Sequence, residues 1–296
     1  MTGTAITLDE LNAFDEQAFV GALDGIYEKA PWVAAVAARS RPFATVSDLH
    51  DSLMRAVRQK TAEELLVFLN SHPTLGGREA KAGAVTVESA REQDGLGLVL
   101  LPGDEARTLE VLNASYQAKF GFPFLICVRR HTRPSILRAL RERLENHLEQ
   151  ERANALVEIE HIARLRLVDR VRGAGAPNVV GRVSTHVLDT HAGRPADNVK
   201  IELFECGHIR PVRLVETTTN AEGRTDQPLI DGAPLRIGKY EIVFHMGAYF
   251  RQRAVIATWQ PFLDEVCVRF GIGEPESHYH VPLVVTPWSY ATYRGS

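Results

Sequence analysis

The sequence predicts a two-domain protein, in which an all-α, bundle-like N-terminal domain precedes an all-β C-terminal sandwich. The chain has 296 residues, about twice the usual length of one domain. Apolar residues recur with helical spacing up to about residue 172 and alternate with polar residues beyond about 180. Between these parts lies Gly173-Ala174-Gly175-Ala176-Pro177, a composition typical of a linker. We therefore expect domains at 1–172 and 181–296, with a linker at 173–180.

Helix-start signals and apolar stripes support the helical domain. Thr7 with Glu10, and Thr61 with Glu64, have the spacing of a capping box, in which hydroxyl and carboxylate bind the free amides of a first turn. Pro134 suits the first turn of a later helix. Apolar residues with helical spacing follow: Leu65, Leu66, Phe68 and Leu69, then Ile136, Leu137, Leu140, Leu144 and Leu148, then Leu156, Ile159, Ile162, Ala163 and Leu167.

Alternation and turn signals support the β domain. Residues 199–205 and 240–244 alternate apolar and polar side chains, as half-buried strands do. Turn-forming residues at 220–223 and at Asp231-Gly232 separate the runs. A small sandwich of two sheets is the simplest architecture for such strands.

Composition and charge exclude several classes of protein. The hydrophobic content of 45% is enough for real cores, and the formal charge of −3 argues against partners such as nucleic acid or an anionic membrane. No run approaches the roughly 18 apolar residues of a membrane helix, and the first residues lack a basic-then-apolar signal pattern. Three cysteines without metal-site spacing indicate reduced thiols. The cytosol is the expected compartment.

Candidate chemistry in the helical domain begins at Ser71-His72-Pro73. The residue before a proline is pushed out of the α region, so His72 should lie at the end of a helix. Ser89, Glu92 and Gln93 can share one helical face. Taken alone, these residues leave open a structural His72 and a solvated Glu92.

A family resemblance adds specific roles. Five ordered motifs over residues 10–171 resemble the 2-oxo-4-hydroxy-4-carboxy-5-ureidoimidazoline (OHCU) decarboxylases. They are His72-Pro73-Thr74-Leu75, Ser89-x-x-Glu92-Gln93, Asn113-x-x-Tyr116-x-x-Lys119-Phe120-Gly121-Phe122-Pro123-Phe124, Arg143-Leu144-x-Asn146 and Ile162-Ala163-x-x-Arg166-Leu167.

The resemblance implies a site that needs no cofactor. His72 is implied as proton donor, with Glu92 orienting it or the substrate hydroxyl, and Arg166 as partner of the anionic substrate. The implied substrate-binding residues are Pro73, Ser89, Gln93, Phe124 and Ile126.

The β domain carries its own candidates near the chain end. His278 and His280 should point to the same face of an extended strand, since side chains alternate with period two. The pair could line one pocket. One core histidine and one solvated histidine is the simpler alternative.

Four ordered motifs over residues 180–296 resemble the transthyretin-like 5-hydroxyisourate hydrolases. They are Val183-Ser184-Thr185-His186-Val187-Leu188-Asp189-Thr190, Gly193-Arg194-Pro195-Ala196, Thr219-Asn220-Ala221-Glu222-Gly223-Arg224 and the tail from His278 to Ser296. The resemblance implies that the fold is transthyretin-like and that the active site lies between subunits of a tetramer. Its implied residues are His186, Arg224, His280, Tyr293 and Ser296.

These residue types suit hydrolysis. A neutral imidazole, His280 with His186 beside it, can deprotonate water near neutral pH. The planar donors of Arg224 can stabilise a developing oxyanion, and Tyr293 and Ser296 would close the pocket.

The two resemblances together imply one route, because the hydrolase product is the decarboxylase substrate. The chain is expected to convert 5-hydroxyisourate to (S)-allantoin as a homo-oligomer, a dimer or tetramer, with the apolar run 281–285 at a subunit interface. Two alternatives stay open: a transthyretin-like binding module beside an active decarboxylase, and a three-histidine metal site at His186, His278 and His280.

Overall fold

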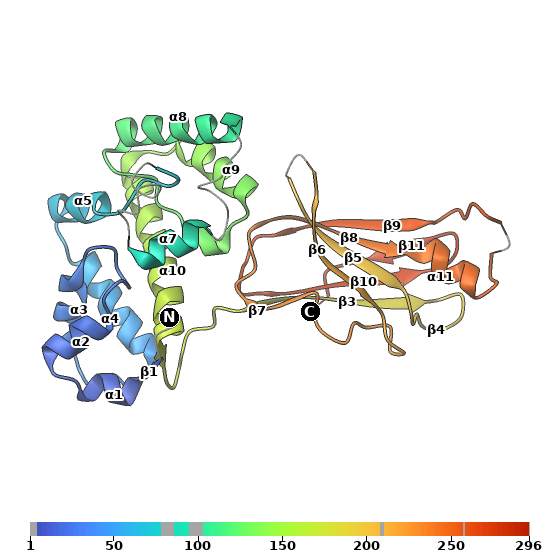
Figure 1. Ribbon diagram of the computed structural model, residues 1–296, viewed down its shortest axis with the longest axis horizontal. Coiled ribbons are helices and arrows are strands. Elements are labelled where there is room, and N and C mark those ends of the chain that lie inside the picture. Colours follow the sequence, from blue (N-terminus) through green and yellow to red (C-terminus); the bar gives the residue numbers. More distant parts are fainter. Residues whose placement is uncertain (1–4, 78–85, 95–102, 208–209, 257, 296) are drawn as a thin grey trace. The chain divides into compact units, whose positions relative to one another are not determined.

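The computed structural model describes residues 5–77, 86–94, 103–207, 210–256 and 258–295, with the backbone alone at 93–94 (Figure 1). The chain divides into two compact units, one formed by residues 1–129 and 135–179, the other by 130–134 and 180–296. Helices build the first unit and β-strands the second, which confirms the predicted fold class. No helix in the described ranges is both long and apolar enough to cross a membrane.

The helical unit is arranged around one long helix, α10 (Leu148–Arg170) (Figure 1). Short strands β1 (Ile6–Thr7) and β2 (Val171–Arg172) pair in parallel. The other described helices are α1 (Leu8–Ala13), α2 (Glu16–Ala22), α3 (Pro31–Ala38), α4 (Val46–Arg58), α5 (Ala62–Asn70), α7 (Val87–Asp94), α8 (Gly103–Phe120) and α9 (Arg133–Arg143).

The predicted helix starts are confirmed. Capping boxes at Thr7 and Thr61 begin α1 and α5, and Pro134 lies in the first turn of α9. Each box satisfies backbone amides that a first turn leaves without partners.

The core of this unit holds α10 in place. Ile159, Ala163 and Leu167 recur every four residues along α10 and are fully buried or nearly so. Glu151, near the start of α10, is also buried and accepts hydrogen bonds from Tyr116 of α8. Arg143 and Asn146 donate to the same carboxylate. A buried charge satisfied by several donors fixes the register of α10.

The first residues of the predicted linker pack on the helical unit. Val46 N donates to Ala174 O at 3.0 Å, and Ser47 N donates to Gly175 O at 3.2 Å. Gly175 has a φ of +62°, and a Cβ there would lie 2.7 Å from the Thr45 side chain. Glycine is therefore required at this position.

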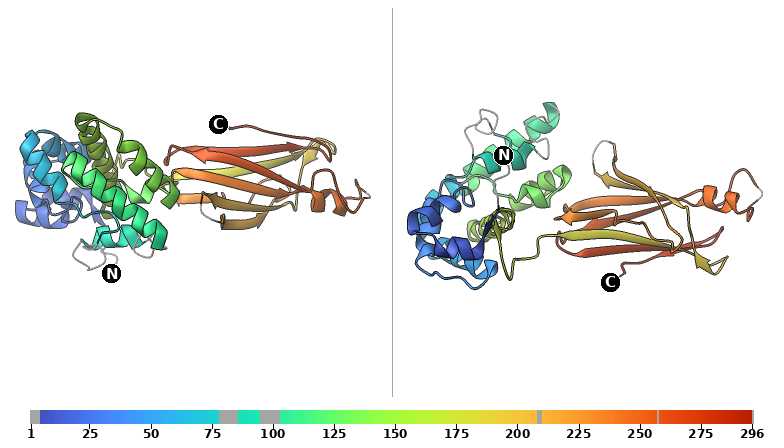
Figure 2. Two further views of the ribbon diagram at one scale, coloured as in Figure 1. Left: turned by 90° about the horizontal axis from the view of Figure 1, so that it is seen from above. Right: turned by 60° about the horizontal axis from the view of Figure 1, so that its bottom comes forward.

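The second unit is a sandwich of two sheets, which Figure 2 shows as two layers. One sheet has the order β11-β10-β3-β4, with β7 also paired to β3, and the other has the order β6-β5-β8-β9. The bounds in the first sheet are β3 (Gly181–Asp189), β4 (Arg194–Pro195), β7 (Ile230–Ala233), β10 (His278–Val285) and β11 (Tyr290–Thr292). Those in the second are β5 (Lys200–Cys206), β6 (Val212–Thr218), β8 (Gly238–His245) and β9 (Glu265–Ile272), with α11 (Met246–Gln252) between β8 and β9.

The parallel pair β3 and β10 decides which side chains face outward. His280 lies opposite Ser184, and Pro282 lies opposite His186. Tyr279 and Val281 are buried between the sheets, so His278 and His280 share the outer face, as predicted.

One expectation for this unit is wrong, and another is narrowed. The turn predicted at Asp231-Gly232 lies inside β7, whose pairing with β3 shifts register between Gly181 and Val183. Such an irregular pairing accommodates the positive φ of Gly232 without ending the strand. In the apolar run 281–285, Val281, Leu283 and Val285 fill the core of the sandwich. Only Pro282 and Val284, on the outer face with His280, remain for the predicted subunit interface, which stays a prediction.

Candidate active sites

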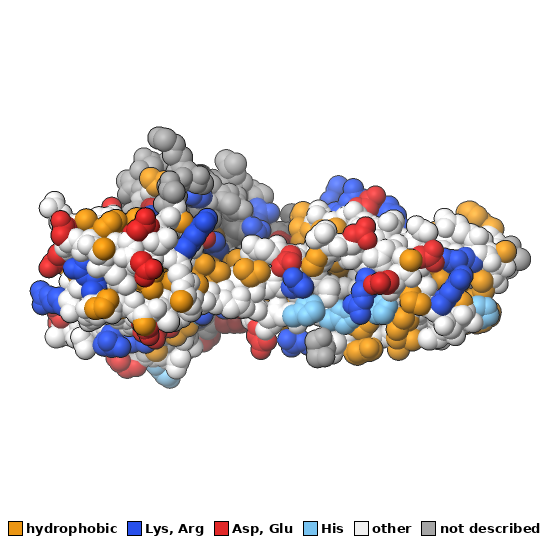
Figure 3. All heavy atoms as spheres, turned by 90° about the horizontal axis from the view of Figure 1, so that it is seen from below, with side chains coloured by type: hydrophobic (Ala, Val, Ile, Leu, Met, Phe, Trp, Pro, Cys, Tyr) orange, Lys and Arg blue, Asp and Glu red, His pale blue; other side chains and the backbone are white. Residues whose placement is uncertain are grey.

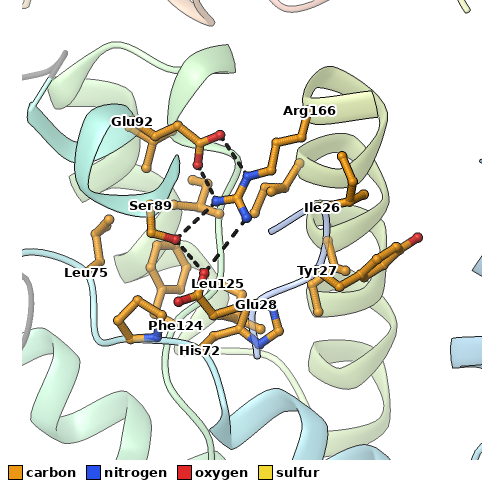
Figure 4. Close-up of a pocket in the computed structure, with 15 residues that line it drawn as sticks. Ile26, Tyr27, Glu28, His72, Leu75, Ser89, Glu92, Phe124, Leu125 and Arg166 are labelled. Atoms are coloured by element: carbon orange, nitrogen blue, oxygen red, sulfur yellow. Dashed lines mark hydrogen bonds and ion pairs between the residues drawn. The ribbon is translucent and has the colours of Figure 1, made fainter. Parts of the chain in front are cut away.

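A pocket in the helical unit gathers side chains that are far apart in the sequence (Figure 4). Its walls come from the segment after α2, the segment after α5, helix α7, residues 124–128 and helix α10. The predicted residues that line it are His72, Pro73, Ser89, Glu92, Phe124, Ile126 and Arg166. The side chain of Gln93, also predicted here, lies outside the described residues.

Arg166 is the centre of the polar network in this pocket (Figure 4). Its Nε donates to Glu92 Oε1 at 3.0 Å and its Nη2 to Glu92 Oε2 at 2.7 Å. Nη2 also donates to the Ser89 hydroxyl at 3.1 Å. Burial by itself would lower the pKa of the guanidinium, but the hydrogen bonds and charge of Glu92 outweigh burial and raise it. Arg166 is therefore a permanent cation whose position Glu92 fixes.

Glu28 is a member of the site that sequence reasoning missed. Its side chain is only 1% exposed and lies 3.8 Å from Arg166 Nη1. The carboxylate accepts hydrogen bonds from the Thr86 hydroxyl at 2.6 Å and the Ser89 hydroxyl at 2.8 Å. Burial would raise the pKa of Glu28, yet these hydrogen bonds hold it below its usual value. Glu28 is thus an ionised carboxylate in the wall of the pocket.

Helix α7 is held largely by such polar contacts. Ser89 is its one buried residue among those described, whereas Val87 is 71% exposed. In addition to the contacts of Glu28 and Arg166 with α7, Arg170 of α10 donates a hydrogen bond to Glu88 of α7 at 2.7 Å. Charged hydrogen bonds, not apolar burial, therefore place Ser89 and Glu92.

His72 is neutral near pH 7. Burial lowers the pKa of its imidazole to about 4. Its Nδ1 lies 3.1 Å from the carbonyl oxygen of Phe68, which can only accept a hydrogen bond, so Nδ1 carries the proton. Nε2 then bears the lone pair. The implied role of proton donor requires His72 to gain a proton first.

A second group of residues lies on the outer face of β3 and β10. Figure 3 shows histidine side chains gathered on one face of this unit, with charged side chains beside them. His186 of β3 pairs with Arg224 through an isolated backbone bridge. Burial, then the charge of Arg224, lower the pKa of His186, and the same two causes lower the pKa of His280. Both imidazoles are therefore neutral near pH 7.

The chain end closes over His280. Gly295 N donates to His280 O at 2.9 Å, and a Cβ at Gly295 would lie 2.6 Å from His280 Cδ2. Tyr293, two residues earlier, is 60% exposed. Ser296 lies outside the described residues. The structure thus brings together His186, Arg224, His280 and the backbone of the tail, as the sequence predicts.

Ser184 is a further residue at this site, between two imidazoles. Its Oγ lies 2.7 Å from His278 Nε2 and 2.9 Å from His280 Nδ1. The Nε2 of His186 is buried and has no hydrogen-bond partner among the described residues. Over the described ranges, no three histidine, cysteine or acidic side chains are grouped so as to hold a metal ion. The three-histidine alternative thus gains no support.

Known proteins resemble each unit separately. A family model described as OHCU decarboxylase matches residues 12–168. The chain belongs to the OHCU decarboxylase family. A relative in that family, the 2-oxo-4-hydroxy-4-carboxy-5-ureidoimidazoline decarboxylase of Amia calva, is 38% identical over 163 residues, which are 55% of this chain and 93% of the relative.

The C-terminal part of this chain matches a second family. The model described as HIUase/Transthyretin family matches residues 183–295. The 5-hydroxyisourate hydrolase of Pseudomonas aeruginosa is 46% identical over 123 residues, which are 42% of this chain and 98% of the relative. A crystal structure of (S)-allantoin synthase covers 98% of this chain and 100% of its own, with 31% identity and a TM-score of 0.54. An OHCU decarboxylase domain is therefore joined to a transthyretin-like domain, as the sequence predicts.

Proposed function

We propose that this chain catalyses two consecutive steps of urate degradation. The transthyretin-like domain hydrolyses 5-hydroxyisourate to OHCU, and the helical domain decarboxylates OHCU to (S)-allantoin. The observation that carries this proposal is the presence of two separate sites, each with the imidazole and guanidinium that its step requires. Relatives of each domain bear the names of the two activities, and the likeness to (S)-allantoin synthase spans both.

Decarboxylation requires an acceptor for an electron pair and a proton. When carbon dioxide leaves, the bond between C4 and the carboxyl group breaks, and its electron pair spreads into the conjugated ring. A proton delivered to one face of the ring then sets the configuration. The pocket supplies one imidazole for this purpose, His72.

His72 can act first as base and then as acid. Its Nε2 lone pair accepts the proton of the substrate hydroxyl, and the resulting imidazolium returns that proton to the ring carbon. The ring nitrogen that receives the electron pair of the broken bond takes a second proton from water. The carbonyl oxygen of Phe68 and the charge of Glu28 both favour the protonated form of His72. They would therefore stabilise the imidazolium between these two transfers.

Arg166 holds the anionic substrate in this scheme. Glu92 and Ser89 accept the protons of Nε and Nη2 and fix the plane of the guanidinium, and the carbonyl oxygen of Gly25 accepts one proton of Nη1. The positive charge and the remaining Nη1 N–H are left for the substrate carboxylate. Both oxygens of Glu92 accept from Arg166, so we assign Glu92 to positioning Arg166, not to orienting His72.

Hydrolysis uses the neutral imidazoles of the other site. His280 takes a proton from water, which attacks a ring carbonyl, and Arg224 stabilises the oxyanion that forms. The charge of Arg224 that lowers the pKa of His186 and His280 keeps both able to accept a proton near pH 7.

We further propose that the chain works as a homo-oligomer. Trp288, Tyr290 and Tyr293 are 60%, 46% and 60% exposed on the strand and tail that follow β10. Large aromatic side chains grouped at a surface are typical of protein interfaces. Light scattering of the purified chain tests this, and a monomer at micromolar concentration would contradict it.

The function is tested with freshly made 5-hydroxyisourate, followed by ultraviolet absorbance. His280→Ala should leave 5-hydroxyisourate to decay at the buffer rate, and His72→Ala should accumulate OHCU. Matched controls are His191→Ala and His147→Ala, which remove exposed histidines from the same two domains. If the turnover of His280→Ala lies within about tenfold of wild type, the decrease is smaller than the loss of a general base causes. Such a result would show that His280 is not the general base. If 5-hydroxyisourate disappears no faster with wild type than in buffer, the result favours the alternative in which the transthyretin-like domain is a binding module.

A further inference from the structure

The hydroxyl of Ser184 joins two imidazoles on the outer face of the transthyretin-like domain. Ser184 lies on β3 directly opposite His280 of β10, and His278 is two residues before His280 on the same face. The Oγ distances of 2.7 Å to His278 Nε2 and 2.9 Å to His280 Nδ1 are both hydrogen bonds. The chain His278–Ser184–His280 is therefore continuous.

A hydroxyl has one proton, so Ser184 donates to one imidazole and accepts from the other. In one arrangement Ser184 donates to His280 Nδ1, and His280 then carries its proton on Nε2 and cannot act as a base there. In the other, His280 Nδ1–H donates to Ser184, and Ser184 donates to His278 Nε2. Only the second arrangement gives His280 a basic Nε2.

We propose that Ser184 positions His280 in this second arrangement and connects it to His278 as a proton relay for hydrolysis. This inference rests on the hydrolase function proposed above. Water gives a proton to His280 Nε2 as its oxygen bonds to the ring carbonyl. The Nδ1 proton of His280 passes to Ser184 Oγ, and the Ser184 proton passes to His278 Nε2. No proton is created or lost, and the positive charge moves from His280 to His278.

The surroundings of the two imidazoles favour movement of the positive charge from His280 to His278. The charged and titratable groups facing His280 are Arg224, His186 and His278, all of which oppose a positive charge on it. His278 is exposed, whereas His280 is half-buried. The cation beside His278, Arg182, is paired with Asp231 at 3.0 Å. A positive charge is therefore better solvated on His278, from which water can remove the proton.

Kinetics of Ser184→Ala test the relay. We expect the hydrolysis kcat to fall about 10- to 100-fold, part of the contribution of a general base, with KM within about threefold. Ser184→Thr restores the hydroxyl on a residue that suits a strand and should recover most of kcat. Ser277→Ala, which removes a hydroxyl bound to Glu274, is the matched control. OHCU decarboxylation by the same variant should be unchanged, because that step uses the separate pocket of the helical domain, and strand circular dichroism equal to wild type shows that the transthyretin-like domain is folded.

A spectroscopic measurement separates this role from a structural one. Nitrogen-15 NMR of the wild type should show the His280 proton on Nδ1, and Ser184→Ala should lose this preference. An unchanged kcat in Ser184→Ala, or a wild-type His280 with its proton on Nε2, would overturn the relay while hydrolysis by the wild type stands. Absence of hydrolysis in the wild type would overturn the proposed function and the relay together.

Discussion

Arg166 and Glu92 form a planar pair of two hydrogen bonds, from Nε to Oε1 at 3.0 Å and from Nη2 to Oε2 at 2.7 Å. The two residues are 74 positions apart and belong to α10 and α7. Because both groups are charged and nearly buried, the pair fixes α7 at the pocket and sets the direction of the guanidinium.

Glu92→Gln should impair decarboxylation far more than folding. The amide keeps one acceptor oxygen but loses the charge and the second acceptor, so Arg166 can turn. We expect kcat to fall at least about 100-fold, as misplacement of a positioning group can cause, and the free energy of unfolding to fall by about 1 to 3 kcal/mol. Glu88→Gln, which breaks the Arg170 pair on the same helix, is the control. Near-normal OHCU turnover in Glu92→Gln removes Glu92 from the mechanism.

Glu28→Gln should also slow decarboxylation, although the sequence does not single out this residue. The substitution removes a charge that favours protonated His72 and replaces one acceptor of the Thr86 and Ser89 hydroxyls by a donor. We expect a loss of about tenfold or more in kcat, equivalent to about 1.4 kcal/mol. Steady-state kinetics of Glu28→Gln measure this loss. The control is Glu160→Gln, because Glu160 is a partly exposed carboxylate of α10 that is paired with Arg58. Equal kinetics of Glu28→Gln and wild type contradict a role for Glu28.

The helical domain should lose stability in acid through His72. The pKa of His72 is about 4 in the folded chain, against an ordinary value of 6.5. Between these values only the unfolded chain binds this proton, so the free energy of unfolding falls as pH drops through this window. We expect the wild type to lose about 2 to 3 kcal/mol more than His72→Asn between pH 6.5 and 4. Urea unfolding followed by helical circular dichroism measures the difference, and identical pH slopes would contradict a buried neutral His72.

Gly295→Ala should damage hydrolysis without affecting decarboxylation. A Cβ at this position would lie 2.6 Å from His280 Cδ2, so either the imidazole or the tail must move. A displacement of about 1 Å at a catalytic group can cost about 100-fold in rate. Gly193→Ala is a control for glycine replacement, because a Cβ there meets nothing within 4 Å. Its positive φ would still strain the turn, so thermal unfolding of both variants is measured as well. Full hydrolysis by Gly295→Ala would show that the tail does not constrain His280.

Local signals in the sequence predict the helix starts and the faces of the strands. The capping boxes at Thr7 and Thr61 form because hydroxyl and carboxylate are three residues apart, and no distant contact is needed. His278 and His280 share a face because strand side chains alternate. The Asp231-Gly232 pair shows the limit of such signals, since a positive φ fits a bulged strand as well as a turn.

The partners within the sites could not be predicted in the same way. Glu28 is 61 residues from Ser89 and follows no helical or strand pattern, so its burial and hydrogen bonds exist only in the packed domain. Ser184 appears in the sequence as part of a strand motif. Its position between His278 and His280 depends on the parallel register of β3 and β10, which the sequence does not specify.

The central claim is that one chain performs two consecutive steps at two separate sites. A complementation time course tests it: fresh 5-hydroxyisourate is given to wild type, His72→Ala, His280→Ala and an equimolar mixture of the two variants, and optically active allantoin is followed by circular dichroism. We predict rapid optical activity with wild type and with the mixture, because each variant supplies the site that the other lacks. His72→Ala alone should give racemic product, and His280→Ala alone should give optical activity only as slowly as 5-hydroxyisourate decays in buffer, because its decarboxylase site is intact. A mixture no faster than His280→Ala alone, or wild-type product without optical activity, would contradict the account.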